Sequence, residues 1–168
     1  MRRCVVSGII LLLILALSGC SGKNNTVEQP ANFYYCTSSI SFDTAHGVIA
    51  PETRDIAGFE QDLTALINHY LRGPNSSNLT SPFPNGSAVL WINQSDRELT
   101  LIMNQQFTQL TGLNLSLACS CISKTIFSLT DFESITIRAR DTNLDGTKSV
   151  TMTRDSILIQ DRIMMPPA

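Results

Sequence analysis

The pattern of apolar and polar positions after residue 30 predicts short strands alternating with two helices. Aromatic or alternating stretches predict strands at 32–37, 88–92, 99–103 and 134–138. Apolar residues recur at helical spacing over 59–71 and 117–129, so each of these segments should bury one face. The first helix should end at Gly73-Pro74, because glycine accepts the left-handed conformation at a helix end and proline cannot continue the helix.

The segments between these elements predict the connections. Residues 38–55 show no regular pattern and are expected to form a loop with at most a short extended piece, and 75–86 a long surface loop. A turn over 93–97 should make an antiparallel hairpin of its flanking strands, and the turn signal Asp145-Gly146 should bring 149–153 back as a hairpin arm. The expected order is β-α-β-β-α-β with a terminal hairpin, a two-layer α+β sandwich with one small sheet.

The first twenty residues have a different pattern. Two arginines precede an uncharged apolar stretch from Val5 to Leu17, which is short for a membrane span but suits the apolar part of a secretory signal. Small residues then precede Cys20, an order that resembles the bacterial lipobox, in which the cysteine is acylated after cleavage before it. The alternative is an uncleaved anchor helix with an incidental cysteine. Either interpretation places the rest of the chain at a membrane, outside the cytoplasm.

These features divide the chain into four parts. Residues 1–19 are expected to be a lipoprotein signal peptide and 20–30 a flexible tether that begins at the lipidated Cys20. The folded domain should span 31–155, with 156–168 as a C-terminal tail. A body of this size can bury one core.

Composition narrows the classes of function. Only 15% of the 168 residues are charged, and the net charge is −2. Without residues 1–19, ten basic residues face fourteen acidic ones, a net charge of −4. Nucleic acid is therefore not an expected partner, since binding to a phosphate backbone needs a basic excess.

A calcium loop is the most recognisable candidate site, and the sequence argues against it. Residues 141–146 read Asp-Thr-Asn-Leu-Asp-Gly, the first half of an EF-hand loop. The twelfth position is Met152, where a bidentate glutamate is needed, and the flanking segments are predicted strands. A turn between two strands accounts for the same residues, so no metal or cofactor is expected.

Candidate acid–base and nucleophilic groups are similarly isolated. His46 and His69 have no nucleophile or metal ligand at a recognisable spacing, and Asp131 and Glu133 suit a solvated turn. We therefore expect no enzyme.

The cysteines left for the folded domain are odd in number. Cys36, Cys119 and Cys121 remain after Cys20 is assigned to lipid, and the last two would point to nearly opposite sides of one helix. A Cys36–Cys121 disulfide would be possible if the second helix packs on the first strand. Small buried apolar residues are the alternative.

Several spaced segments resemble the GerMN domain, a domain of sporulation and spore-germination proteins. Leu71-Arg72-Gly73-Pro74 is similar to its L-x-G-P signature, and residues 79–87 are similar to its segment gLtSaiPeGt. Residues 99–107 and 128–137 resemble later family segments, with Asp145-Gly146 in place of a closing D-G. Together these segments cover about residues 31–155. Asn104 stands where the family often has serine, and only one copy of the domain is present.

The resemblance implies a compact module of the ring-building type, in a family that includes envelope lipoproteins and is not known for catalysis. We therefore expect a lipoprotein on the extracytoplasmic face of the membrane. Its GerMN-like domain would be a non-enzymatic, ring-forming assembly module that binds an envelope protein in sporulation or germination. Five residues are expected to mark an interaction edge: Gly73, Pro74, Pro82, Pro84 and Gly86. Backbone geometry is the alternative reason for their presence. The alternative is a cell-wall glycan or small-solute binder, with Trp91, Tyr34 or Tyr35 as a stacking platform.

Overall fold

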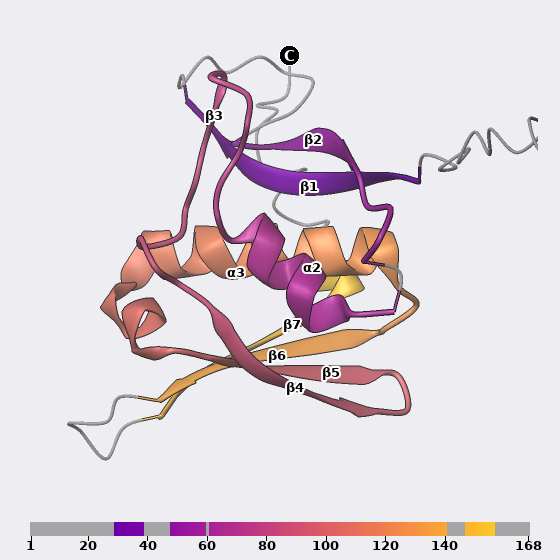
Figure 1. Ribbon diagram of the computed structural model, residues 1–168. Coiled ribbons are helices and arrows are strands. Elements are labelled where there is room, and N and C mark those ends of the chain that lie inside the picture. The colour runs from indigo at the N-terminus through magenta and orange to yellow at the C-terminus, as the bar shows by residue number, and fades with distance from the viewer. Residues whose placement is uncertain (1–28, 39–47, 60, 141–146, 157–168) are drawn as a thin grey trace, which may run out of the picture.

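The computed structural model describes residues 29–38, 48–59, 61–140 and 147–156 and confirms an α+β fold (Figure 1). Residues 1–28, which hold the leader, Cys20 and most of the tether, lie outside the described residues, as do His46, the loop 141–146 and the tail from 157. The elements are β1 (Pro30–Thr37), β2 (Ile49–Asp55), α2 (Leu63–Tyr70), β3 (Leu79–Thr80), β4 (Val89–Ser95), β5 (Glu98–Met103), the 3₁₀ helix η1 (Gln105–Gln109), α3 (Gly112–Leu129), β6 (Ser134–Arg140) and β7 (Thr147–Thr153).

The strands form two sheets, where the sequence predicted one. One sheet has the order β2-β1-β3 and the other β4-β5-β6-β7. Figure 1 shows α2 and α3 between the two sheets. The predicted hairpins β4–β5 and β6–β7 are confirmed as antiparallel, whereas β5 and β6 run parallel. The first strand therefore belongs to a separate sheet on the far side of the helices, and the two-layer prediction lacked this layer.

β2 lies in the segment 38–55, where the sequence predicted a loop with at most a short extended piece, and it is a strand of seven residues. Its residues are mostly polar and include Pro51, which lies opposite Tyr34 of β1. Both backbone groups of Tyr34 point away from β2, the N–H to Thr125 and the carbonyl to Tyr70. At this position the strand pair therefore needs no N–H from Pro51, which has none. β2 is also an edge strand, and proline is tolerated at edge positions of this kind.

The edge of β1 that faces away from β2 is closed by side chains from the helices. The Tyr34 N–H donates to Thr125 Oγ1 at 2.9 Å, and the Tyr70 hydroxyl donates to the Tyr34 carbonyl at 2.6 Å. One turn further along α3, the Ser128 hydroxyl donates to the Asn32 carbonyl at 3.2 Å. Beyond these residues β3 pairs with the end of β1. Hydroxyl groups thus replace a neighbouring strand along half of this edge.

α3 is the central helix of the domain. By length and composition it is the one described helix that could cross a membrane. Its stretch from Ala118 to Phe127 is buried except for Lys124, because the two sheets cover it from both sides. At its C-terminal end the Arg154 guanidinium donates to the carbonyls of Phe127, Thr130 and Phe132. A cation at a helix C-terminus satisfies carbonyls that have no partner within the helix.

α2 is shorter than the apolar pattern predicted. Asp62 caps it, accepting from the Ala65 N–H at 2.8 Å, so Phe59 precedes the helix. The helix ends at Tyr70, and Gly73 follows with φ of 104°, as the Gly73-Pro74 signal predicted. The β4–β5 turn is also tighter than the predicted 93–97, because β4 continues to Ser95.

Candidate functional site

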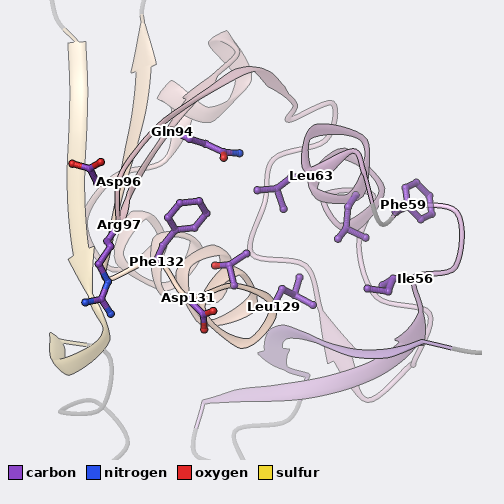
Figure 2. Close-up of a pocket in the computed structure, with 11 residues that line it drawn as sticks. Ile56, Phe59, Leu63, Gln94, Asp96, Arg97, Leu129, Asp131 and Phe132 are labelled. Atoms are coloured by element: carbon purple, nitrogen blue, oxygen red, sulfur yellow. The ribbon is translucent and has the colours of Figure 1, made fainter.

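A cleft of about 480 Å³ opens where the β4–β5 turn, the start of α2 and the end of α3 meet (Figure 2). In Figure 2 Leu63 and Phe132 lie on opposite sides of this space, with Gln94 above them. The apolar residues that line it are Ile56, Phe59, Leu63, Leu66, Leu129 and Phe132, and the polar ones are Gln94, Asp96, Arg97, Thr130 and Asp131. An apolar interior with a polar rim can accept an apolar side chain or ligand.

The rim of this cleft contains Asp131, one of the two carboxylates that the sequence placed in a solvated turn. Asp131 and Glu133 are both exposed, and Glu133 pairs with Arg97 at 2.6 Å. Across the described ranges, no group of three or more His, Cys, Asp or Glu side chains could hold a metal ion. The lining of the cleft thus combines an apolar interior with charged side chains at its rim.

A second polar cluster joins β2 to the loop after α2. Glu52 and Arg54 form an ion pair at 3.2 Å with side chains only 12% and 8% exposed. The Arg54 guanidinium also donates to the Gly73 carbonyl at 2.7 Å, and the Tyr35 hydroxyl donates to the same carbonyl at 3.1 Å. The Asn75 N–H donates to Glu52 at 3.1 Å.

This cluster is built for stability rather than for proton transfer. Burial raises the pKa of Glu52, but hydrogen bonds from Arg54 and Asn75 outweigh it and hold the pKa below its ordinary value. Burial raises the pKa of Tyr35 well above its ordinary value, although the nearby Arg54 opposes the shift. Arg54 itself lies over the rings of Phe33 and Tyr35, 5.4 and 5.3 Å from their centroids. The Glu52 carboxylate therefore stays ionised and the Tyr35 phenol stays neutral at pH 7.

The predicted interaction residues fall into two groups. Gly73 and Pro74 lie in the packed loop that this cluster holds, and a β-carbon on Gly73 would lie 3.5 Å from Ser81 Cβ. Pro82 and Pro84 are half-buried on either side of the buried Phe83, whereas Gly86 is exposed. The structure thus explains Gly73 by backbone geometry and brings Gly86 to the surface, while the contact role of all five residues stays a prediction.

His69 lies in the last turn of α2. Its ring packs against Phe59 with 5.3 Å between centroids. Burial lowers its pKa, and the charges of Arg54 and Arg72 add to this effect. The ring is a neutral packing group at pH 7.

An exposed apolar pair on β4 joins Trp91, which the sequence offered as a stacking platform, to Leu90, which sequence reasoning missed. Leu90 and Trp91 are 56% and 57% exposed, and we call these two residues the β4 patch. The register between β4 and β5 shifts between Val89 and Trp91, which lets two successive side chains both reach solvent. β4 is also the edge of its sheet.

Comparison with known proteins identifies the fold. Neither a protein-family profile nor a curated protein sequence matches this chain. A solved structure does match: the tandem GerMN domains of the sporulation protein GerM from Bacillus subtilis, with a TM-score of 0.55 and 23% identity. The described chain has a GerMN-like fold. The match covers 72% of this chain and 42% of the GerM structure, so this chain spans less than half of that protein.

A second solved structure resembles the GerMN-like domain less closely. It is a Clostridium perfringens protein described as a lipoprotein, with a TM-score of 0.47 and 15% identity. The match covers 76% of this chain and 89% of that one.

The β4 patch of the GerMN-like domain left a weak signal in the sequence. The run Val89-Leu90-Trp91-Ile92 is continuously apolar, which is typical of a strand buried on both faces. The residues after it, Asn93 to Ser95, are all polar, as on an exposed edge strand. Only the bulge explains why Leu90 and Trp91 share the solvent side, and a bulge cannot be recognised from the apolar pattern.

Proposed function

We propose that this protein is a lipid-anchored assembly module of the cell envelope, acting in sporulation or germination by binding another envelope protein rather than by catalysis. The GerMN-like fold supports the class of domain. The order of cationic start, apolar stretch and Cys20 supports the anchor. The tether of residues 20–30 would hold the domain close to the membrane surface.

The β4 patch carries this proposal. Two large apolar side chains exposed side by side on an edge strand lose contact with water when a partner covers them. An edge strand also offers unpaired backbone groups to a neighbouring strand. Gly86, one of the predicted interaction residues, lies four residues before Leu90 and is itself exposed.

Photocrosslinking in cells tests the contact. A benzophenone amino acid at position 91 should form an adduct with one envelope protein or with a second copy of this chain. The matched control is position 151, because Thr151 is exposed on β7, the opposite edge of the same sheet. No protein adduct at 91, or equal adducts at 91 and 151, would contradict the proposed surface.

The anchor needs a separate test. Cys20→Ala should abolish palmitate labelling and move the protein from the membrane to the soluble extracytoplasmic fraction. Cys36→Ala should leave both unchanged, since Cys36 lies within the folded domain. Retention of label and membrane location in Cys20→Ala would contradict lipidation at this residue.

Exposure of Trp91 also favours the second candidate, a binder of cell-wall glycan. Trp91 lies opposite Ile102 on β5, and Arg138 of β6 lies next to Ile102. Two positions further along, on β6 and β7, the hydroxyls of Thr136 and Thr151 are hydrogen-bonded at 2.9 Å. An indole on the same face of the sheet as these hydroxyl groups suits stacking and hydrogen bonding to a sugar.

Purified sacculi distinguish the two candidates. Glycan binding predicts that the protein sediments with sacculi and that Trp91→Ala abolishes this, whereas Leu90→Ala leaves it intact. A protein contact predicts no sedimentation and loss of the crosslinked partner in both variants. Circular dichroism of each variant confirms that the fold survives.

A further inference from the structure

Two cysteines from distant parts of the chain meet where α3 packs on β1. Three pairs of positions set the register of this packing: Asn32 with Ser128, Tyr34 with Thr125, and, further along, Cys36 with Cys121. The first two pairs are hydrogen-bonded, at 3.2 and 2.9 Å.

The rise per residue of a strand and of a helix extends this register to the third pair. Two residues along a strand advance about 6.6 Å, and four residues along a helix about 6 Å. Moving from Tyr34 to Cys36 therefore matches moving from Thr125 back to Cys121. The Lys124 ammonium lies 5.1 Å from the Tyr34 ring centroid, which places this face of α3 over the Tyr34 face of β1. Each of the two thiols also shifts the pKa of the other, as neighbouring groups do.

We propose that Cys36 and Cys121 form an intramolecular disulfide when the folded protein meets a disulfide oxidant such as oxidised glutathione or a thiol–disulfide oxidoreductase. The bond ties the three-stranded sheet covalently to the central helix. It does not depend on the β4 patch or on a particular partner.

The two thiols have different roles in the exchange. The neighbouring Cys121 lowers the pKa of Cys36, which is half-buried, so Cys36 is the thiol that reacts first. The neighbouring Cys36 and burial raise the pKa of Cys121, which has no exposed surface.

The reaction is balanced as two exchange steps. The Cys36 thiolate attacks one sulfur of the oxidant, forming a mixed disulfide and releasing one thiolate. Cys121 then loses its proton and attacks the Cys36 sulfur, forming the internal bond and releasing the second thiolate. The two cysteines lose two protons and two electrons, and the oxidant's disulfide is reduced to two thiols.

Cys119 is the internal control. It is fully buried, and burial raises the pKa of its thiol to about 12. It lies two residues from Cys121, about 200° away around the helix, so it faces away from Cys36. Cys119 should stay reduced.

Peptide mapping of the purified full chain tests the proposal. The reduced protein is exposed to oxidised glutathione without denaturant, alkylated and digested. We expect a linked pair of peptides containing Cys36 and Cys121, lighter by two hydrogen atoms, with Cys119 alkylated only after unfolding. Cys119→Ser should still form the link. Cys121→Ser should instead hold a glutathione adduct on Cys36, because the second step is blocked.

Two outcomes would overturn the proposal: Cys36 and Cys121 that stay free under these conditions, or Cys36 linked to Cys119 instead. If a serine variant does not fold, the peptide map of the wild-type protein is sufficient to test the disulfide. The oxidised protein should also unfold at a higher temperature than the reduced protein, and reduction should reverse this. Equal melting temperatures would show that the link does not tie the sheet to the helix.

Discussion

Replacing Arg54 by methionine isolates the contribution of the buried ion pair. Methionine keeps an unbranched apolar stem between the rings of Phe33 and Tyr35, while Glu52 loses its cationic partner. Removing one partner of a buried pair costs roughly 3–5 kcal/mol, because the other charge stays buried. Glu52 keeps the N–H of Asn75 and some exposure, so we expect about 3 kcal/mol of unfolding free energy to be lost.

Urea unfolding of the full chain, followed by far-UV circular dichroism, measures this loss. The control is Arg97→Met, which breaks a shorter pair with Glu133, 2.6 Å long but 66% and 57% exposed. This variant should lose less than about 1 kcal/mol. In a Glu52→Gln background no charge is left buried, so Arg54→Met should cost much less there. Equal costs in both backgrounds, or equal costs for Arg54 and Arg97, would refute the reasoning.

Three further predictions follow from the same contacts. The Asn68 side chain bonds both the N–H and the C=O of Val89, at 2.8 and 3.1 Å, so Asn68→Ala should cost about 1–2 kcal/mol and speed hydrogen exchange at the Val89 amide. Unchanged exchange would contradict this. Gly73→Ala should cost about 1–2 kcal/mol in urea unfolding because φ is 104°, and a neutral result would remove the backbone explanation of this glycine. His69 has a lowered pKa in the fold, so the unfolded chain binds its proton first and stability falls as pH drops below about 6.5. His69→Gln should flatten the melting temperature between pH 7.5 and 5.5, and an unchanged slope would assign the pH dependence to other groups.

The local elements could be predicted wherever one side of an element is apolar. The segments that became β5, β6 and α3 have regular apolar spacing, and they were placed within two residues for the strands, whereas α3 begins five residues before its predicted start. β2 has no such spacing, because Glu52 and Arg54 occupy its inward positions as an ion pair. A strand whose buried side is charged cannot be recognised from an apolar pattern.

The candidate surface was predictable only in part. The role of Gly73 in the turn could be predicted, because glycine adopts the left-handed conformation at a helix end and the following proline cannot continue the helix. The exposure of Trp91 depends on which strands lie beside β4, and the pairing of Cys36 with Cys121 depends on which helix covers β1. These are long-range relations, which no local window of sequence contains.

The hydroxyl groups that close the edge of β1 also set the order in which the domain can be completed. Tyr34 and Thr125 are 91 residues apart in the chain. A ribosome adding about 5–20 residues per second takes roughly 5–18 s to cover that interval. During that time the strand has left the ribosome without its partner helix, and its unpaired edge can join another nascent chain. We expect a chaperone or an export factor that binds extended segments to protect residues 30–37 until synthesis has passed α3.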